Sequence, residues 1–210
     1  MTLTNPRSPA AAAQGFTLIE LAIVATIIGL ILVVVLQGQS LIDTSQSQAV
    51  QIAVKDLATA MSQFRDRYGY LPGDIPNATT QVPGVVAGSC SVTANGNGDG
   101  QIDAAEIPCV NTHLFQAGLI KGGAAATTII ASGGKIITIR TAARTASPVS
   151  SFPSSTRNVI EIWNVPCQIA QDLDAKTDDG NFATGNTRAT VASCVVGGAN
   201  DPVATMAVAL

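Results

Sequence analysis

The stretch Gly15–Glu20, which reads GFTLIE, opens the most apolar part of the chain and places one carboxylate inside it. Residues 16–36 contain no Lys, Arg or Pro, and their only clearly polar members are Thr17, Glu20 and Thr26. As a helix rising 1.5 Å per residue, this run is about 30 Å long, which is enough to cross the hydrocarbon core of a bilayer. The stretch therefore predicts a membrane-spanning helix that contains an acid.

The flanks of this run favour an anchor over an ordinary export signal. An export signal has an apolar region of about 7–15 residues that ends in a small-residue cleavage site. The run here is longer, and no A-x-A pattern closes it. Arg7 is the only basic residue before it and Lys55 is the first after it. The positive-inside rule thus predicts a cytoplasmic N-terminus and an external C-terminal body.

Glu20 is costly in a lone anchor. A carboxylate near the middle of a spanning helix costs about 2.5–3.5 kcal/mol on insertion scales, and such acids usually have a partner. We expect no partner for Glu20 within the helix. A lone anchor helix therefore leaves the carboxylate of Glu20 unexplained.

Gly15–Glu20 and the apolar run after it resemble the prepilin signature shared by type IV pilins and the pseudopilins of type II secretion. The resemblance implies that prepilin peptidase cuts between Gly15 and Phe16 and methylates Phe16. It also implies that Glu20 pairs with the N-terminal amine of a neighbouring subunit during filament assembly. A buried acid and a buried ammonium offset each other's desolvation only when paired. The leader Met1–Gly15 departs from the family, whose leaders are usually more basic.

The resemblance also implies a fold, a location and partners. The expected fold is α+β and pilin-like: a long N-terminal helix, transmembrane and then amphipathic, packed on a small antiparallel sheet. The expected parts are a leader (1–15), the helix (16–70, with 16–36 in the membrane or filament core) and a globular head (71–210). The protein would wait in the inner membrane with its head in the periplasm and then enter a filament. Its partners would be other copies or related pilins, prepilin peptidase, the assembly machinery and membrane lipid.

Two alternatives stay open. Within the resemblance, the sequence does not separate a major pilin, a minor pilin and a secretion pseudopilin. Outside it, the rival is a membrane-anchored periplasmic binding module that never polymerises. A secreted enzyme would need a nucleophile or base, and no G-x-S-x-G, phosphate loop or dinucleotide-binding turn is present. We therefore expect no enzyme activity, and we expect the only histidine, His113, to be a packing or surface residue.

Helical periodicity continues beyond the membrane segment. Apolar residues spaced by 4, 3, 4, 3 and 4 form one stripe, which consists of Val50, Val54, Leu57, Met61, Phe64 and Tyr68. The sequence Leu71–Asp74 (LPGD) predicts that the helix stops near Tyr70. In the head, strands are predicted at 135–140 and 158–163, with weaker ones at 189–196 and 203–210, and helices near 109–120 and 166–176. Residues 122–132 and 141–156 are predicted to be surface loops.

The segment Asn95–Glu106 matches the spacing of an EF-hand calcium loop at every slot except the first, where Asn95 replaces Asp. Carboxylate, amide and backbone oxygens are the ligands that Ca²⁺ prefers. The predicted ligands are Asn95, Asn97, Asp99, the backbone carbonyl of Gln101, Asp103 and Glu106. Residues 91–94 do not read as an entering helix, so a Gly/Asn-rich turn with its acids in solvent is the alternative. Major pseudopilins bind calcium, so the resemblance agrees with a weak, millimolar site.

A second acidic run and the cysteines complete the candidates. In Asp172–Asn181, we expect Asp178 or Asp179 to cap backbone amides in a turn closed by Gly180, with a metal site as the alternative.

Four cysteines allow three pairings. We predict that neighbours pair, and metal ligation is disfavoured because no C-x-x-C occurs; the predicted disulfides are Cys90–Cys109 and Cys167–Cys194. With a net charge of −3 and no basic cluster, no nucleic-acid partner is expected.

Overall fold

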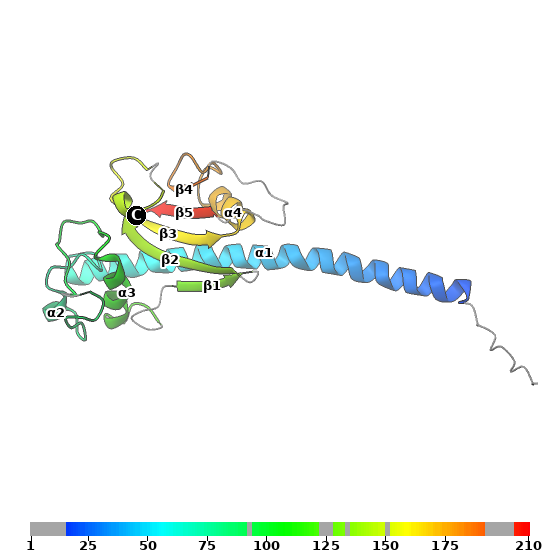
Figure 1. The fold of residues 1–210 in the computed structure, drawn as a ribbon, viewed down its shortest axis with the longest axis horizontal. Coiled ribbons are helices and arrows are strands. Elements are labelled where there is room, and N and C mark those ends of the chain that lie inside the picture. The colour runs from blue at the N-terminus through cyan, green and yellow to red at the C-terminus, as the bar shows by residue number, and fades with distance from the viewer. Residues whose placement is uncertain (1–15, 92–93, 122–127, 133–134, 150–151, 192–203) are drawn as a thin grey trace, which may run out of the picture. The chain divides into compact units, whose positions relative to one another are not determined.

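The computed structural model describes residues 16–91, 94–121, 128–132, 135–149, 152–191 and 204–210. The chain divides into two compact units, Met1–Ile42 and Asp43–Leu210. The boundary between them lies inside the long helix α1, which runs from Leu18 to Tyr68 and confirms the predicted helix. Figure 1 shows α1 together with the sheet and the short helices.

The N-terminal part of α1 has the length and composition of a membrane-spanning helix. The window Leu18–Val35 has a mean hydropathy of 3.0. Its large apolar side chains are exposed, as at Leu18 (90%) and Leu30 (68%). A soluble helix would cover such a surface against a core. Among the described residues, this is therefore one N-terminal helix able to span a bilayer.

The second unit contains a small antiparallel sheet and short helices, so the chain is α+β. The described strands form a five-stranded sheet in the order β1-β2-β3-β5-β4, and every neighbouring pair is antiparallel. The strands are β1 (Thr128–Ser132), β2 (Lys135–Ala143), β3 (Asn158–Val165), β4 (Thr187–Ala189) and β5 (Ala204–Ala209). The helices are α2 (Ala78–Gln81), α3 (Ile107–Gln116) and α4 (Cys167–Thr177), with a 3-10 turn at Arg144–Ala146.

The predicted apolar stripe forms one side of the core. Val50, Leu57 and Phe64 are 0–5% exposed, and Tyr68 packs against the same cluster. Alternate residues of the central strands face this cluster because side chains of a strand alternate between its two faces. The sheet and α4 contribute Ile137, Ile139, Ile160, Ile162, Met206, Ile169 and Leu173. Packing of this stripe, rather than helix propensity, thus fixes the second half of α1.

The structure corrects several predicted boundaries. Thr128–Ser132, predicted as loop, forms β1 and pairs with β2 in a register that places Ile130 opposite Ile137. Strand β2 continues to Ala143, into the segment 141–156 predicted as loop. The predicted strand 189–196 overlaps the short β4 (Thr187–Ala189) only at Ala189. Thr190 and Val191 are not in a strand, and residues 192–196 lie outside the described part.

Helix α3 ends earlier than the predicted 109–120. Gly118 adopts a φ of +71°, and the backbone N–H of Leu119 donates to the carbonyl of Leu114 at 2.9 Å. The N–H of Gly118 donates to the carbonyl of Phe115 at 2.9 Å. These two bonds form a Schellman motif, which needs a residue of positive φ just after the helix. The first glycine after the apolar run therefore ends the helix, before Gly122 and Gly123 are reached.

Candidate functional site

Glu20 has a hydrogen-bonding partner in its own chain. The backbone N–H and the hydroxyl of Thr17 donate to Glu20 Oε2 at 2.9 and 2.8 Å, and the backbone N–H of Glu20 donates to Thr17 Oγ1 at 3.3 Å. This reciprocal arrangement is a capping box, which satisfies backbone donors at the start of a helix. The expectation that the helix offers Glu20 no partner is therefore wrong, and the T-x-x-E spacing was the overlooked signal.

The capping box supplies no opposite charge. Both Thr17 donors use Oε2, and among the described residues none donates to Glu20 Oε1. Phe16, the expected first residue after cleavage, is 89% exposed. Gly15 lies outside the described residues, so cleavage between Gly15 and Phe16 stays a prediction.

The predicted calcium loop Asn95–Glu106 folds around a carboxylate from outside it. Asp74 is 1% exposed, and its Oδ1 accepts hydrogen bonds from the backbone N–H groups of Gly98 (2.7 Å) and Asp99 (3.0 Å). Its Oδ2 accepts from the N–H of Gly100 at 2.9 Å. Burial raises the pKa of Asp74 above its usual range, although these N–H groups act to lower it. Sequence reasoning used Asp74 only as part of a helix stop, because its partners are more than twenty residues away.

Glu106 closes the same loop from its other end. Its Oε1 accepts from the N–H of Asn97 at 2.8 Å, and its Oε2 accepts from the N–H of Asp103 at 3.0 Å. Burial raises the pKa of this carboxyl too. Strand β3 holds the middle of the loop, since Asn158 accepts from the N–H of Ile102 at 2.8 Å and donates to the carbonyl of Gly100 at 2.9 Å.

The other predicted side-chain ligands of calcium also have partners within or beside the loop. Asp103 Oδ2 accepts from the amide group of Asn97 at 3.3 Å. Asn95 Oδ1 accepts from the N–H of Thr79, Asn97 Oδ1 from the N–H of Asp99, and Asp99 Oδ1 from the N–H of Gln101. Among the described residues, the carboxylates of this loop do not form a group of three ligand atoms within 4.8 Å of one another. The loop is thus built by its own hydrogen bonds, and calcium binding at it stays a prediction.

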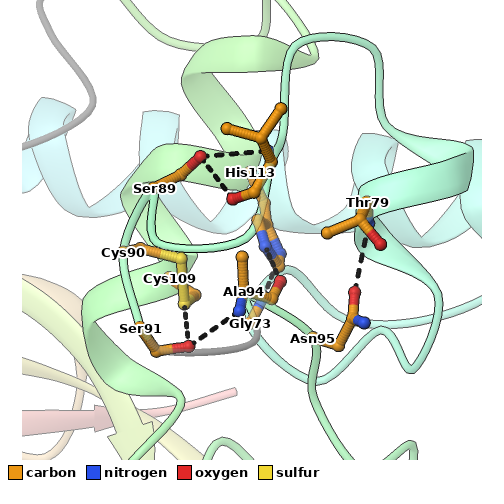
Figure 2. Close-up of a disulfide and its surroundings, with 10 residues drawn as sticks. Gly73, Thr79, Ser89, Cys90, Ser91, Ala94, Asn95, Cys109 and His113 are labelled. Atoms are coloured by element: carbon orange, nitrogen blue, oxygen red, sulfur yellow. Dashed lines mark hydrogen bonds between the residues drawn. A yellow bond between two sulfur atoms is a disulfide. The ribbon is translucent and has the colours of Figure 1, made fainter.

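The disulfide Cys90–Cys109 is present as predicted and lies beside the buried His113 (Figure 2). His113 Nδ1 accepts from the N–H of Gly73 at 2.9 Å, so its Nε2 carries the proton that reaches the carbonyl of Ala94 at 3.0 Å. Burial lowers the pKa of His113, which keeps the ring neutral. Both ring nitrogens are used structurally and both sulfurs are oxidised, so these three residues do not make a metal site.

The second predicted disulfide is only partly within the described structure. Cys167 is buried at the start of α4. Its predicted partner, Cys194, lies outside the described residues, so the pairing Cys167–Cys194 stays a prediction.

The acidic run after α4 forms the predicted turn. Asp179 Oδ1 accepts from the N–H of Asn181 at 2.9 Å, and Asp178 Oδ2 accepts from the N–H of Thr187 at 2.7 Å. Gly180 has a φ of +76°, as a turn of this kind requires. The capping role given to Asp178 and Asp179 is confirmed.

One residue of this region is unlike the others. Asp174, in the last turns of α4, is 0% exposed, and neither of its carboxylate oxygens has a hydrogen-bond partner. One ligand atom from each of Asp174, Asp178 and Asp179 lies within 4.8 Å of the other two. Burial, followed by the charges of Asp178 and Asp179, raises the pKa of Asp174 to about 6.

No model of a protein family, no curated protein and no solved structure matches this chain.

Proposed function

We propose that this chain is a structural subunit of a type IV pilus or a related filament, processed by prepilin peptidase and assembled through residues 16–36. The observation that carries the proposal is an acid, Glu20, near the start of an otherwise apolar, exposed helix. In a lone anchor this carboxylate only caps the first turn of the helix, and its charge is costly within the bilayer. A bundle of such helices can place it against an amine from a neighbour.

The capping box suggests how the carboxylate works in assembly. Thr17 engages Glu20 through Oε2, which fixes the carboxylate at the first turn of α1. Cleavage before Phe16 creates a new ammonium group one residue from Thr17. In the filament, Oε1 of one subunit pairs with the ammonium of the next, so that neither charge is buried alone. Apolar packing of the remaining helix supplies the other contacts.

Three variants separate the charge of Glu20 from its capping role. Glu20→Gln keeps a capping acceptor but removes the charge, because Gln also serves in a capping box. Thr17→Ala removes the cap and keeps the charge. Glu20→Val removes both and makes the helix more apolar. Each is expressed with the assembly machinery of its host, and sheared filaments, membrane-bound subunit and the mass of the N-terminus are measured.

We expect Glu20→Gln and Glu20→Val to be inserted and processed but not assembled, and Thr17→Ala to assemble. Assembly of Glu20→Gln at the wild-type level would refute the charge-pairing role. A wild-type chain that remains in the membrane without cleavage or filaments would favour the non-polymerising anchored module instead.

Within this proposal, a pseudopilin of type II secretion is the second form of the same assembly. Calcium bound by Asn95–Glu106 remains part of the proposal, as an ion that would stiffen the head. Calorimetric titration of Asp99→Asn with CaCl₂ tests this loop.

A further inference from the structure

We propose that Asp174, Asp178 and Asp179 form a calcium site at the C-terminal end of α4, separate from the predicted loop Asn95–Glu106. The proposal depends only on the unit Asp43–Leu210 and is independent of filament assembly. Its basis is a buried carboxylate that lacks a partner and points into a group of acids.

The first step is the state of Asp174. Neither of its oxygens has a hydrogen-bond partner, and the residue is 0% exposed. Leaving a charged group buried and unpaired costs several kcal/mol, so such a group is paired, coordinates a metal or gives up its charge by protonation. Asp74 makes the contrast clear, since it is equally buried but accepts three backbone N–H groups. Asp174 needs a partner that its described surroundings do not supply.

The second step is the geometry of the group. Asp174 and Asp178 are four residues apart, so a helix that continues to its C-cap at Asp178 brings them to one face. The turn closed by Gly180 adds Asp179. The three ligand atoms lie within 4.8 Å of one another. Two oxygens at 2.3–2.6 Å from one Ca²⁺ are separated by at most about 5 Å, so each pair of these atoms is close enough to share one ion.

The electrostatic field at the C-terminal end of α4 is negative. The C-terminal end of a helix carries a partial negative charge, and three carboxylates at that end are mutually repulsive. The positive charge of Arg188 stabilises the charged form of Asp179. The guanidinium of Arg188 donates to the carbonyls of Gly185 and Ala183. A bound divalent cation would offset both the helix end and the acids. The field therefore favours a cation at this position.

The chemistry of the ligands favours Ca²⁺ over Zn²⁺ and Mg²⁺. All three ligands are carboxylates, which suit hard cations and disfavour Zn²⁺ relative to sites with His or Cys. Mg²⁺ holds its ligands at 2.0–2.1 Å, so opposite oxygens are at most about 4.2 Å apart, and it prefers to keep its water. Ca²⁺ takes about 6–8 oxygens in flexible geometry, so it accepts three carboxylates presented by one turn more readily than Mg²⁺, which demands a near-ideal octahedron.

The turn itself is rigid enough to present these ligands. Gly185 has a φ of +73°, and a Cβ at this position would lie 2.0 Å from Asp178 Oδ2. Only glycine leaves room for that carboxylate. Asp178 and Asp179 are also held by Thr187 and Asn181. Two of the three ligands are therefore fixed before an ion arrives, which lowers the cost of binding.

The test is calorimetric titration of the full chain in detergent micelles, stripped of metal, with CaCl₂ to about 10 mM, the upper range of extracellular sites. The variants are Asp174→Asn and Asp179→Asn in the group, Asp172→Asn as the matched control on the same helix, and Asp99→Asn in the loop Asn95–Glu106. We expect both group variants to weaken binding at one site by about tenfold or more, because ligand charge sets the affinity. We expect Asp172→Asn to bind as the wild type does.

Thermal unfolding supplies a second readout for the same proteins. For the wild type and Asp172→Asn, about 10 mM Ca²⁺ is expected to raise the Tm by about 3–6 °C relative to EDTA, and Mg²⁺ by less. For Asp174→Asn and Asp179→Asn, the rise should be lost. No calcium binding by the wild type, equal binding by the group variants, or a loss seen only in Asp99→Asn would overturn the proposal. Asp179 is exposed, so its variant keeps the test valid even where Asp174→Asn fails to fold.

Discussion

Replacing Asp74 with Asn should destabilise the unit Asp43–Leu210, although the two side chains have the same shape. The amide oxygen of Asn can keep the bonds from Gly98 and Asp99, which share Oδ1. The amide NH₂ then faces the N–H of Gly100, donor against donor, where Oδ2 had accepted at 2.9 Å. The opposite rotamer is worse, because it sets the NH₂ against two donors.

The magnitude follows from these contacts. Losing one hydrogen bond to a charged acceptor costs about 1.5–3 kcal/mol, and the two bonds that remain lose their charge assistance. A neutral Asn also avoids the cost of burying a charge, the same cost that raises the pKa of Asp74. This gain offsets part of the loss in hydrogen bonding. We expect a net decrease of about 2–3 kcal/mol in the free energy of unfolding.

The assay is urea unfolding of the full chain in detergent at pH 8, followed by the fluorescence of Trp163, the only tryptophan. The control is Asp99→Asn, which makes the same charge change in the loop but affects a single exposed acceptor of one N–H. That control should cost no more than about 0.5 kcal/mol. If Asp74→Asn and Asp99→Asn unfold at the same urea concentration, the three-amide cradle does not stabilise the head and this reasoning fails.

Two further predictions concern the same region. The double variant Cys90→Ser/Cys109→Ser should lose about 3 kcal/mol of unfolding free energy, because the disulfide closes a loop with a sequence separation of 19. Reducing the disulfide of the wild type in the same urea assay should reproduce this loss. Burial lowers the pKa of His113 below 6.5, so the stability it contributes is present above that pH and is lost as the pH falls through the lowered pKa. His113→Gln should therefore have a flatter Tm profile between pH 8 and 5 than the wild type, and parallel profiles would show that the ring does not resist protonation.

The parts of the fold that were predictable are those fixed by local periodicity. The stripe from Val50 to Tyr68 repeats over five intervals, and only a helix places all six residues on one side. Strand β1 was missed because Thr128–Ser132 is short and sits in a segment rich in Ala and Gly, where pairing with β2 decides its structure. A usable signal was nevertheless present, since two glycines separate β1 from β2, a spacing that favours a hairpin.

The functional candidates also differ in whether a local sequence pattern could reveal them. The capping box of Glu20 depends on a residue three positions away, so the sequence contained it in full. Asp74 and Asn158 act on the loop Asn95–Glu106 over 24 and 56 residues, and no local pattern announces such contacts. Asp174 is distinguished only by its burial, which no local pattern in the sequence indicates. An acid in the last turns of a helix otherwise reads as solvated.

Motif spacing and burial therefore lead to different places for a cation in this chain. The spacing of Asn95–Glu106 supplies the right oxygens, but its buried carboxylate, Glu106, and the neighbouring Asp74 are already satisfied by backbone N–H groups. A cation there must compete with bonds that build the loop. Asp178 and Asp179 also accept backbone N–H groups, but Asp174 has no such bond to lose. We therefore expect the larger net gain on binding there, even with fewer ligands. We accordingly expect the tighter of any two calcium sites to be lost in Asp174→Asn and kept in Asp99→Asn, and the reverse order would show that ligand spacing outweighs the need of a buried charge for a partner.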